Sequence, residues 1–146
     1  MFKQFGGIAL ASSALILSAC NPAAELADAD EEVAEFHKRF NAQDFEAIWN
    51  DSDEALTSTT TPEQFQQLMG QLHTYWGNAK STEREGFGLN TNNGVTTVRV
   101  NHQTQFDTGA AVETFNFVRK DDELKLMGYD IKNPDAPGAE DEDAEE

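Results

Sequence analysis

The spacing of apolar residues changes at Gly77, from a helical repeat before it to alternation after it. Thr61-Pro62-Glu63-Gln64 has the composition of a helix start, with a capping threonine, a proline at the first helical position and a glutamine that completes a capping box. The apolar positions that follow, three and four residues apart, are Phe65, Leu68, Met69, Leu72 and Trp76. Gly77 suits a left-handed helix end. We therefore predict a helix over 61–76 and strands after it.

Four segments beyond Gly77 have the alternation of strands, over residues 79–89, 95–106, 111–120 and 124–131. Short polar turns at 90–94, 107–109 and 121–123 join them, which predicts an antiparallel meander. In the second segment one face carries Val98, Val100, His102, Thr104 and Phe106. An alternating apolar face needs a cover, and the helices that precede the sheet supply it.

Two further helices are expected near the start of the chain. Residues 27–41 form the first helix, with Val33, Phe36 and Phe40 near one face and Leu26 just before it on the same side. Residues 44–49 form a second, short helix. Residues 50–61 are polar and loop-like, with one turn around Ala55-Leu56. The predicted fold class is α+β, with N-terminal helices packed in the concave face of a curved four-stranded antiparallel sheet.

The N-terminus has the pattern of an export signal. Residues 1–5 carry one positive charge, Lys3, and the next 12 residues, 6–17, are uncharged, which is too short to span a bilayer. Leu17-Ser18-Ala19-Cys20 follows and resembles the lipobox of bacterial lipoproteins. The resemblance implies removal of residues 1–19 and a diacylglycerol on the sulfur of Cys20, with palmitate among the acyl chains.

Two other interpretations of this segment stay open, an ordinary secretory signal with an incidental Cys20 and an uncleaved anchor. A single cysteine cannot form an internal disulfide, which favours lipidation as its use. By resemblance to enterobacterial sorting, Asn21 favours the outer membrane over the inner one. We expect a lipid-anchored, periplasm-facing protein of the cell envelope.

Composition divides the mature chain into three parts. Residues 20–30 are the lipidated cysteine and an Ala- and acid-rich tether, residues 31–132 are one α+β domain, and residues 133–146 are a disordered acidic tail. Loss of residues 1–19 removes one charge, that of Lys3, so the formal net charge goes from −17 to −18. So acidic a surface repels phosphate backbones and excludes nucleic acid as a partner.

The order of elements in residues 31–132 resembles the cone-shaped nuclear-transport-factor-2-like superfamily, and in particular its lipoprotein domains of unknown function. The segments that carry the resemblance are 40–49, 61–65, Tyr75-Trp76-Gly77 and 126–131. The resemblance implies a pocket at the open end of the cone, and pairing of two copies through the sheet. Some members are isomerases or dehydratases, but no position here matches an enzymatic signature.

Five residues are candidates for a site. His102 shares a strand face with apolar residues and could serve as an acid or base, and Asp130 could do so if it faced inward with Leu124 and Leu126. Tyr75, Trp76 and Tyr129 could line an apolar ligand site. For each, the competing interpretation is ordinary: core packing, or a hydrogen-bonded or solvated side chain.

Metal and cofactor chemistry have little support. Asp51-Ser52-Asp53-Glu54 resembles the opening of a calcium loop, but Ala55 and Leu56 stand where that loop needs a ligand and a glycine. The three histidines have no metal spacing, and neither a phosphate-binding loop nor a nucleophile motif is present. We expect no metal and no cofactor.

These observations favour a non-catalytic domain that binds a small apolar ligand or a protein partner. The alternative is an isomerase- or dehydratase-like enzyme that uses His102 or Asp130 in an apolar pocket. A purely structural module, paired through its sheet, is a third interpretation. A closed cavity that holds His102 or Asp130 beside a second polar group would favour the enzyme, and a core filled by Phe65, Leu72, Phe106 and Phe115 would count against it.

Overall fold

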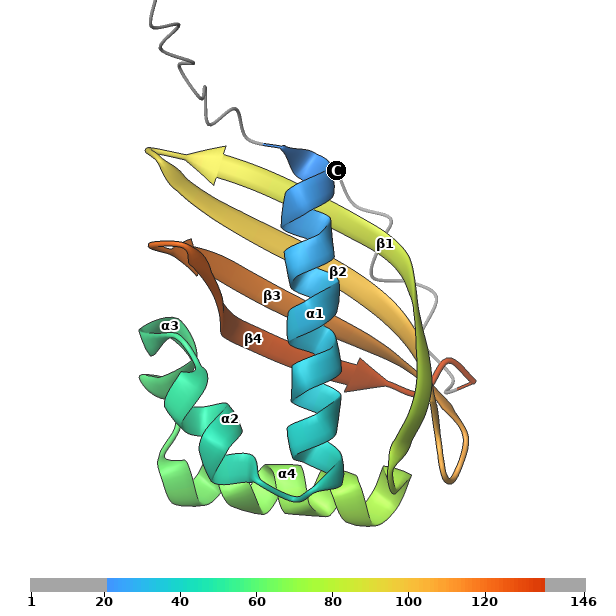
Figure 1. Ribbon diagram of the computed structural model, residues 1–146. Coiled ribbons are helices and arrows are strands. Elements are labelled where there is room, and N and C mark those ends of the chain that lie inside the picture. Colours follow the sequence, from blue (N-terminus) through green and yellow to red (C-terminus); the bar gives the residue numbers. More distant parts are fainter. Residues whose placement is uncertain (1–20, 136–146) are drawn as a thin grey trace, which may run out of the picture.

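The computed structural model describes residues 21–135 and has four helices followed by four strands (Figure 1). The helices are α1 (Pro22–Asn41), α2 (Phe45–Asp51), α3 (Glu54–Thr57) and α4 (Pro62–Trp76). The strands are β1 (Ala79–Asn92), β2 (Val95–Phe106), β3 (Ala110–Lys120) and β4 (Glu123–Lys132). The predicted α+β class is confirmed. The signal segment, Cys20 and residues 136–146 lie outside the described residues.

The sheet is an open antiparallel meander in the order β1-β2-β3-β4. Asn93 and Gly94 both have positive φ, 51° and 78°, in the tight turn between β1 and β2, which matches the right-handed twist of the flanking strands. Figure 1 shows α1 lying across one face of the sheet, with α2, α3 and α4 at one end of that face. We call the helix-covered face the inner face and the opposite face the outer face.

The core forms where α1 meets the inner face. The five alternating residues of β2 predicted to share a face, from Val98 to Phe106, are all buried. Phe115 of β3 is fully buried and meets the ring of Phe36 edge-on, with centroids 5.1 Å apart. Each such side chain contributes about 1.5–3 kcal/mol on burial, so this contact between α1 and the sheet is a substantial part of the stability of the fold.

Helix α1 begins at Pro22, five residues earlier than predicted, so residues 22–30 are helical rather than a tether. The side chain of Asn21 accepts a hydrogen bond from the Ala23 amide, 3.1 Å away, and caps the helix. Arg119 of β3 then bonds Glu25 and Asp28, with its Nη2 2.7 Å from a carboxylate oxygen of each. A cap and a tertiary ion pair thus order this segment, which the acid-rich composition alone would not predict.

Helix α4 has the predicted ends. The capping box of Thr61 and Gln64 is formed, and Gly77 has φ 76°. A Cβ at Gly77 would lie 2.6 Å from Asp107, whose carboxylate accepts a hydrogen bond from the Asn78 amide at 2.7 Å. Only glycine therefore fits this junction between helix and sheet.

The acidic run at 51–54 is structural. The Asp53 side chain accepts from the Ala55 amide at 2.9 Å and caps α3, which is the turn predicted around Ala55-Leu56. Asp51 lies 2.6 Å from Lys125 Nζ and 3.0 Å from Arg39 Nη1. Burial alone would raise the pKa of Asp51, but these two cations outweigh it and lower the pKa. The resemblance to a calcium loop therefore reflects a helix cap and ion pairs.

A β-bulge at Met127 reverses the faces of the last strand. Leu126 pairs with Phe117, whereas Gly128 pairs with Asn116, so Met127 is an extra residue. Beyond a one-residue bulge the alternation continues with the opposite parity. Tyr129 pairs with Phe115 on the inner face, and Asp130 falls on the outer face.

Candidate functional site

A groove of about 510 Å³ opens between α3, α4 and β4. Most of the residues that line it are apolar: Leu56, Phe65, Leu68, Met69, Leu72, Met127, Tyr129 and Ile131, with Ala55, Thr59, Thr60, Gly128 and Asp130 completing the walls. Its volume lies within the range of about 300–1,000 Å³ typical of small-molecule sites. It forms because the helical stripe of α4 is wider than its contact with the core: Phe65 and Met69 are buried, whereas Leu68 remains 51% exposed.

The polar groups of the groove are few and mostly engaged. The Thr59 hydroxyl donates to the Leu56 carbonyl at 2.7 Å, and the Thr60 hydroxyl lies 3.3 Å from Gln64 Oε1. The one charged lining residue is an acid, Asp130, and no lysine or arginine is among the lining residues. An anionic group would meet no cation there, so the groove fits an uncharged apolar molecule.

One wall of the groove is fixed by Tyr129, whose hydroxyl donates to Glu113 Oε1 at 2.6 Å. Burial, and then the negative charge of Glu113, raises the pKa of Tyr129 well above its ordinary value. Glu113 is fully buried, and its Oε2 lies 2.7 Å from His37 Nε2 and 2.6 Å from the Thr104 hydroxyl. We call these four residues, His37, Thr104, Glu113 and Tyr129, the Glu113 cluster.

The sequence analysis did not single out Glu113 or His37. Glu113 occupies an inward position of β3, with the same parity as Ala111, Phe115 and Phe117. A carboxylate at an inward strand position is itself a signal, because a buried charge needs dedicated partners. The partner on α1 lies 76 residues away in the chain, and spacing alone could not reveal it.

His102 is buried under α1 and does not line the groove. Its Nδ1 is 3.0 Å from the Thr82 hydroxyl, and its Nε2 is 3.4 Å from Asp30 Oδ1. Burial lowers the pKa of His102, although Asp30 and Glu113 act in the opposite direction. Its inward orientation is as predicted, but it joins the hydrogen-bonded core rather than the apolar groove.

Asp130 does not face inward with Leu124 and Leu126, because the bulge at Met127 turns it to the outer face, where it is exposed at the rim of the groove. Asp130 is therefore not buried in an apolar pocket, and His102 does not line the groove. Phe65, Phe106 and Phe115 belong to the core cluster and Leu72 packs against it. By the criterion set out above, this arrangement counts against the isomerase or dehydratase alternative.

The three aromatic candidates for a ligand site do not gather around the groove, although the rings of Tyr75 and Trp76 meet edge-on with centroids 4.9 Å apart. Trp76 is buried against Phe106, with ring centroids 5.6 Å apart, and Tyr75 is 63% exposed on the far side of α4. Neighbouring residues of a helix point about 100° apart, so one packs in the core while the other meets solvent. Tyr129 alone lines the groove.

Within residues 21–135, no group of three or more His, Cys, Asp or Glu side chains is arranged to hold a metal ion. None of the helices that the structure describes is both long and apolar enough to cross a membrane.

No family model and no curated protein matches the chain. Among solved structures the chain is similar to Bdellovibrio bacteriovorus Bd1075, with 15% sequence identity and a TM-score of 0.47. The similarity covers 71% of this chain and 38% of that one.

Proposed function

We propose that the protein is a lipid-anchored lipoprotein of the bacterial envelope whose folded domain, facing the periplasm, binds a small uncharged apolar molecule in the groove between α3, α4 and β4. The groove carries the proposal. It combines a volume of about 510 Å³, an apolar lining and a wall fixed from behind by the hydrogen bond between Tyr129 and Glu113. Asp130 lies only at its rim, and the Tyr129 hydroxyl is engaged by the buried Glu113, which favours binding over catalysis.

The proposed anchoring in the envelope rests on Leu17-Ser18-Ala19-Cys20 and on the uncharged segment before it. Two or three acyl chains on one residue anchor a protein firmly, since each buried methylene contributes about 0.8 kcal/mol. Asn21 favours the outer membrane. We also propose that the domain belongs to the cone-shaped nuclear-transport-factor-2-like superfamily, which is supported by helices that precede a four-stranded antiparallel meander.

The binding proposal is tested with N-phenyl-1-naphthylamine, an uncharged apolar dye that fluoresces when it leaves water. We expect saturable fluorescence with the chain from residue 20 onward that carries Cys20→Ala. Leu68→Arg places a charge at the mouth of the groove and should abolish most of the signal. The matched control is Val95→Arg, because Val95 is 48% exposed at the start of β2 and does not line the groove. Equal binding by both variants would rule out the groove.

A competition experiment tests separately whether the ligand is uncharged. Dodecanol should displace the dye at lower concentration than laurate, because the groove offers a carboxylate no cation and places Asp130 at the rim. Preferred displacement by laurate would contradict an uncharged ligand.

A further inference from the structure

Arg99 of β2 is the one Lys or Arg side chain in residues 21–135 for which the structure shows neither an ion pair nor a side-chain hydrogen bond. The sequence has 27 acidic residues to 10 basic ones, so a cation without a carboxylate neighbour is unexpected. Even the highly exposed Lys38 lies 3.4 Å from Glu35.

The surroundings of Arg99 explain this isolation. Its cross-strand neighbours on the outer face are Gly88 of β1 and Asn116 of β3, and Asn116 in turn faces Gly128 of β4. Positions two residues away along β2 are Thr97 and Asn101. The diagonal positions are Gly86, Asn90, Thr114 and Val118. None of these sheet positions carries an acidic residue, so no neighbouring carboxylate on the outer face pairs with the Arg99 guanidinium.

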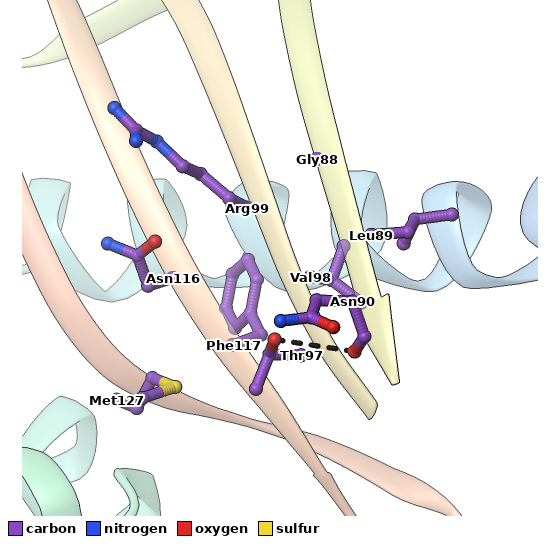
Figure 2. Close-up of a pocket in the computed structure, with 9 residues that line it drawn as sticks. All are labelled: Gly88, Leu89, Asn90, Thr97, Val98, Arg99, Asn116, Phe117 and Met127. Carbon is purple, nitrogen blue, oxygen red and sulfur yellow. Dashed lines mark hydrogen bonds between the residues drawn. The ribbon is translucent and has the colours of Figure 1, made fainter. Parts of the chain in front are cut away.

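A hollow of about 330 Å³ lies beside the cross-strand neighbours Gly88, Arg99 and Asn116. Figure 2 shows the residues that line it: Gly88, Leu89, Asn90, Thr97, Val98, Arg99, Asn116, Phe117 and Met127. In that view Arg99 and Asn116 extend to the same side from neighbouring strands. Thr97 is already bonded to the Asn90 carbonyl, at 3.4 Å, whereas the Asn116 side chain has no hydrogen-bond partner among the described residues.

Arg99 and Asn116 stand side by side on β2 and β3, and the next residue across the sheet on either side is a glycine, Gly88 on β1 and Gly128 on β4. Gly88 leaves the space beside Arg99 free, and a Cβ at Gly128 would lie 3.5 Å from the amide nitrogen of Asn116. The planar fork of an arginine binds a carboxylate through two parallel hydrogen bonds, and an asparagine amide complements a peptide-like amide. Multiply charged anions are disfavoured by the net negative charge of the whole chain.

We propose that Arg99 and Asn116 form a second binding site, on the outer face of the sheet, for a molecule with a single carboxylate beside an amide, such as the end of a short peptide. The guanidinium binds the carboxylate, and the Asn116 amide binds the neighbouring peptide group. The site differs from the apolar groove, which has no lysine or arginine among its lining residues and lies against the helices, although Met127 lines both hollows.

The test is an amide-resolved NMR titration of the chain from residue 20 to 146 that carries Cys20→Ala, with N-acetylglycine as the probe. We expect saturable shifts at the amides of β1, β2 and β3 around Gly88, Arg99 and Asn116. Arg99→Gln should weaken the binding of N-acetylglycine at least about tenfold, since charge-assisted hydrogen bonds are lost. The affinity of Arg99→Lys should lie between that of the natural sequence and that of Arg99→Gln. Lys38→Gln, which removes a cation elsewhere, should leave the titration unchanged.

Three further results decide the chemistry. N-acetylglycinamide, which lacks the charge, should cause no saturable shift, and inorganic phosphate should bind more weakly than N-acetylglycine. Equal binding by either, or unaltered binding by Arg99→Gln, would overturn the proposal. If the shifts arise only after residues 136–146 are deleted, the acids of the chain itself occupy Arg99, and a site for an external ligand is refuted.

Discussion

At the scale of single residues, the fold depends on how Glu113 is satisfied. A carboxylate with no exposure to solvent is costly unless it is paired and hydrogen-bonded, and Glu113 has three partners within 2.7 Å. These partners come from α1, β2 and β4, so one side chain of β3 joins three other elements. The same contacts fix Tyr129, which forms a wall of the groove.

Glu113→Ala should lower the free energy of unfolding by about 3–5 kcal/mol, because it leaves three polar groups without their acceptor in the core. Glu113→Gln keeps the shape and one acceptor oxygen, so the loss should be about 1–2 kcal/mol. Urea denaturation followed by circular dichroism measures both. Glu31→Ala, on the exposed face of α1, is the control and should change stability by less than about 0.5 kcal/mol. Equal losses for all three variants would contradict a special role of Glu113.

At the scale of elements, the first turns of α1 depend on a contact made late in the chain. Arg119 of β3 reaches Glu25 and Asp28, 94 and 91 residues away. Composition alone suggests a tether for these residues, since they are rich in alanine and acids. The segment is helical instead, because alanine has the highest helix propensity and Arg119 binds two of its acids, Glu25 and Asp28.

Arg119→Ala should therefore loosen α1 locally rather than unfold the domain. Amides of residues 24–28 should exchange hydrogen about fivefold faster, which corresponds to the loss of about 1 kcal/mol from a partly exposed ion pair. Amides near Phe36 should be unaffected. Hydrogen exchange measured by NMR tests this, with Lys38→Ala as the control, because the Lys38 side chain is 77% exposed. Uniform acceleration along α1 would show that the pair supports the whole helix.

Local sequence signals predicted the elements well, and contacts distant in sequence account for the errors. The capping box at Thr61, the glycine at 77 and the alternation of β2 are each encoded within a few residues, and all three are present. The orientation of Asp130 was wrong because a bulge is set by pairing with β3 rather than by β4 alone. The groove and the Glu113 cluster were beyond reach, since each combines residues of several elements.

At the scale of the whole molecule, the proposed lipid anchor at Cys20 can be tested by cell fractionation and by labelling with palmitate. Cys20→Ala should give an uncut or soluble species that no longer incorporates labelled palmitate, because the acceptor sulfur is gone. Ser18→Ala keeps a small residue before the cleavage point and should label as the natural sequence does. Unchanged labelling of Cys20→Ala would disprove lipidation.

The early start of α1 at Pro22 limits how far the domain can move from its anchor. Cys20 stands two residues before the helix, and consecutive Cα atoms are about 3.8 Å apart, so less than about 8 Å of chain separates a lipid there from the folded domain. The folded domain would then lie close to the bilayer surface, without a long flexible linker between the lipid and α1. Because a helix of this length spans about 30 Å, both proposed sites would sample only the layer of periplasm next to the membrane, and their ligands would have to come to that layer.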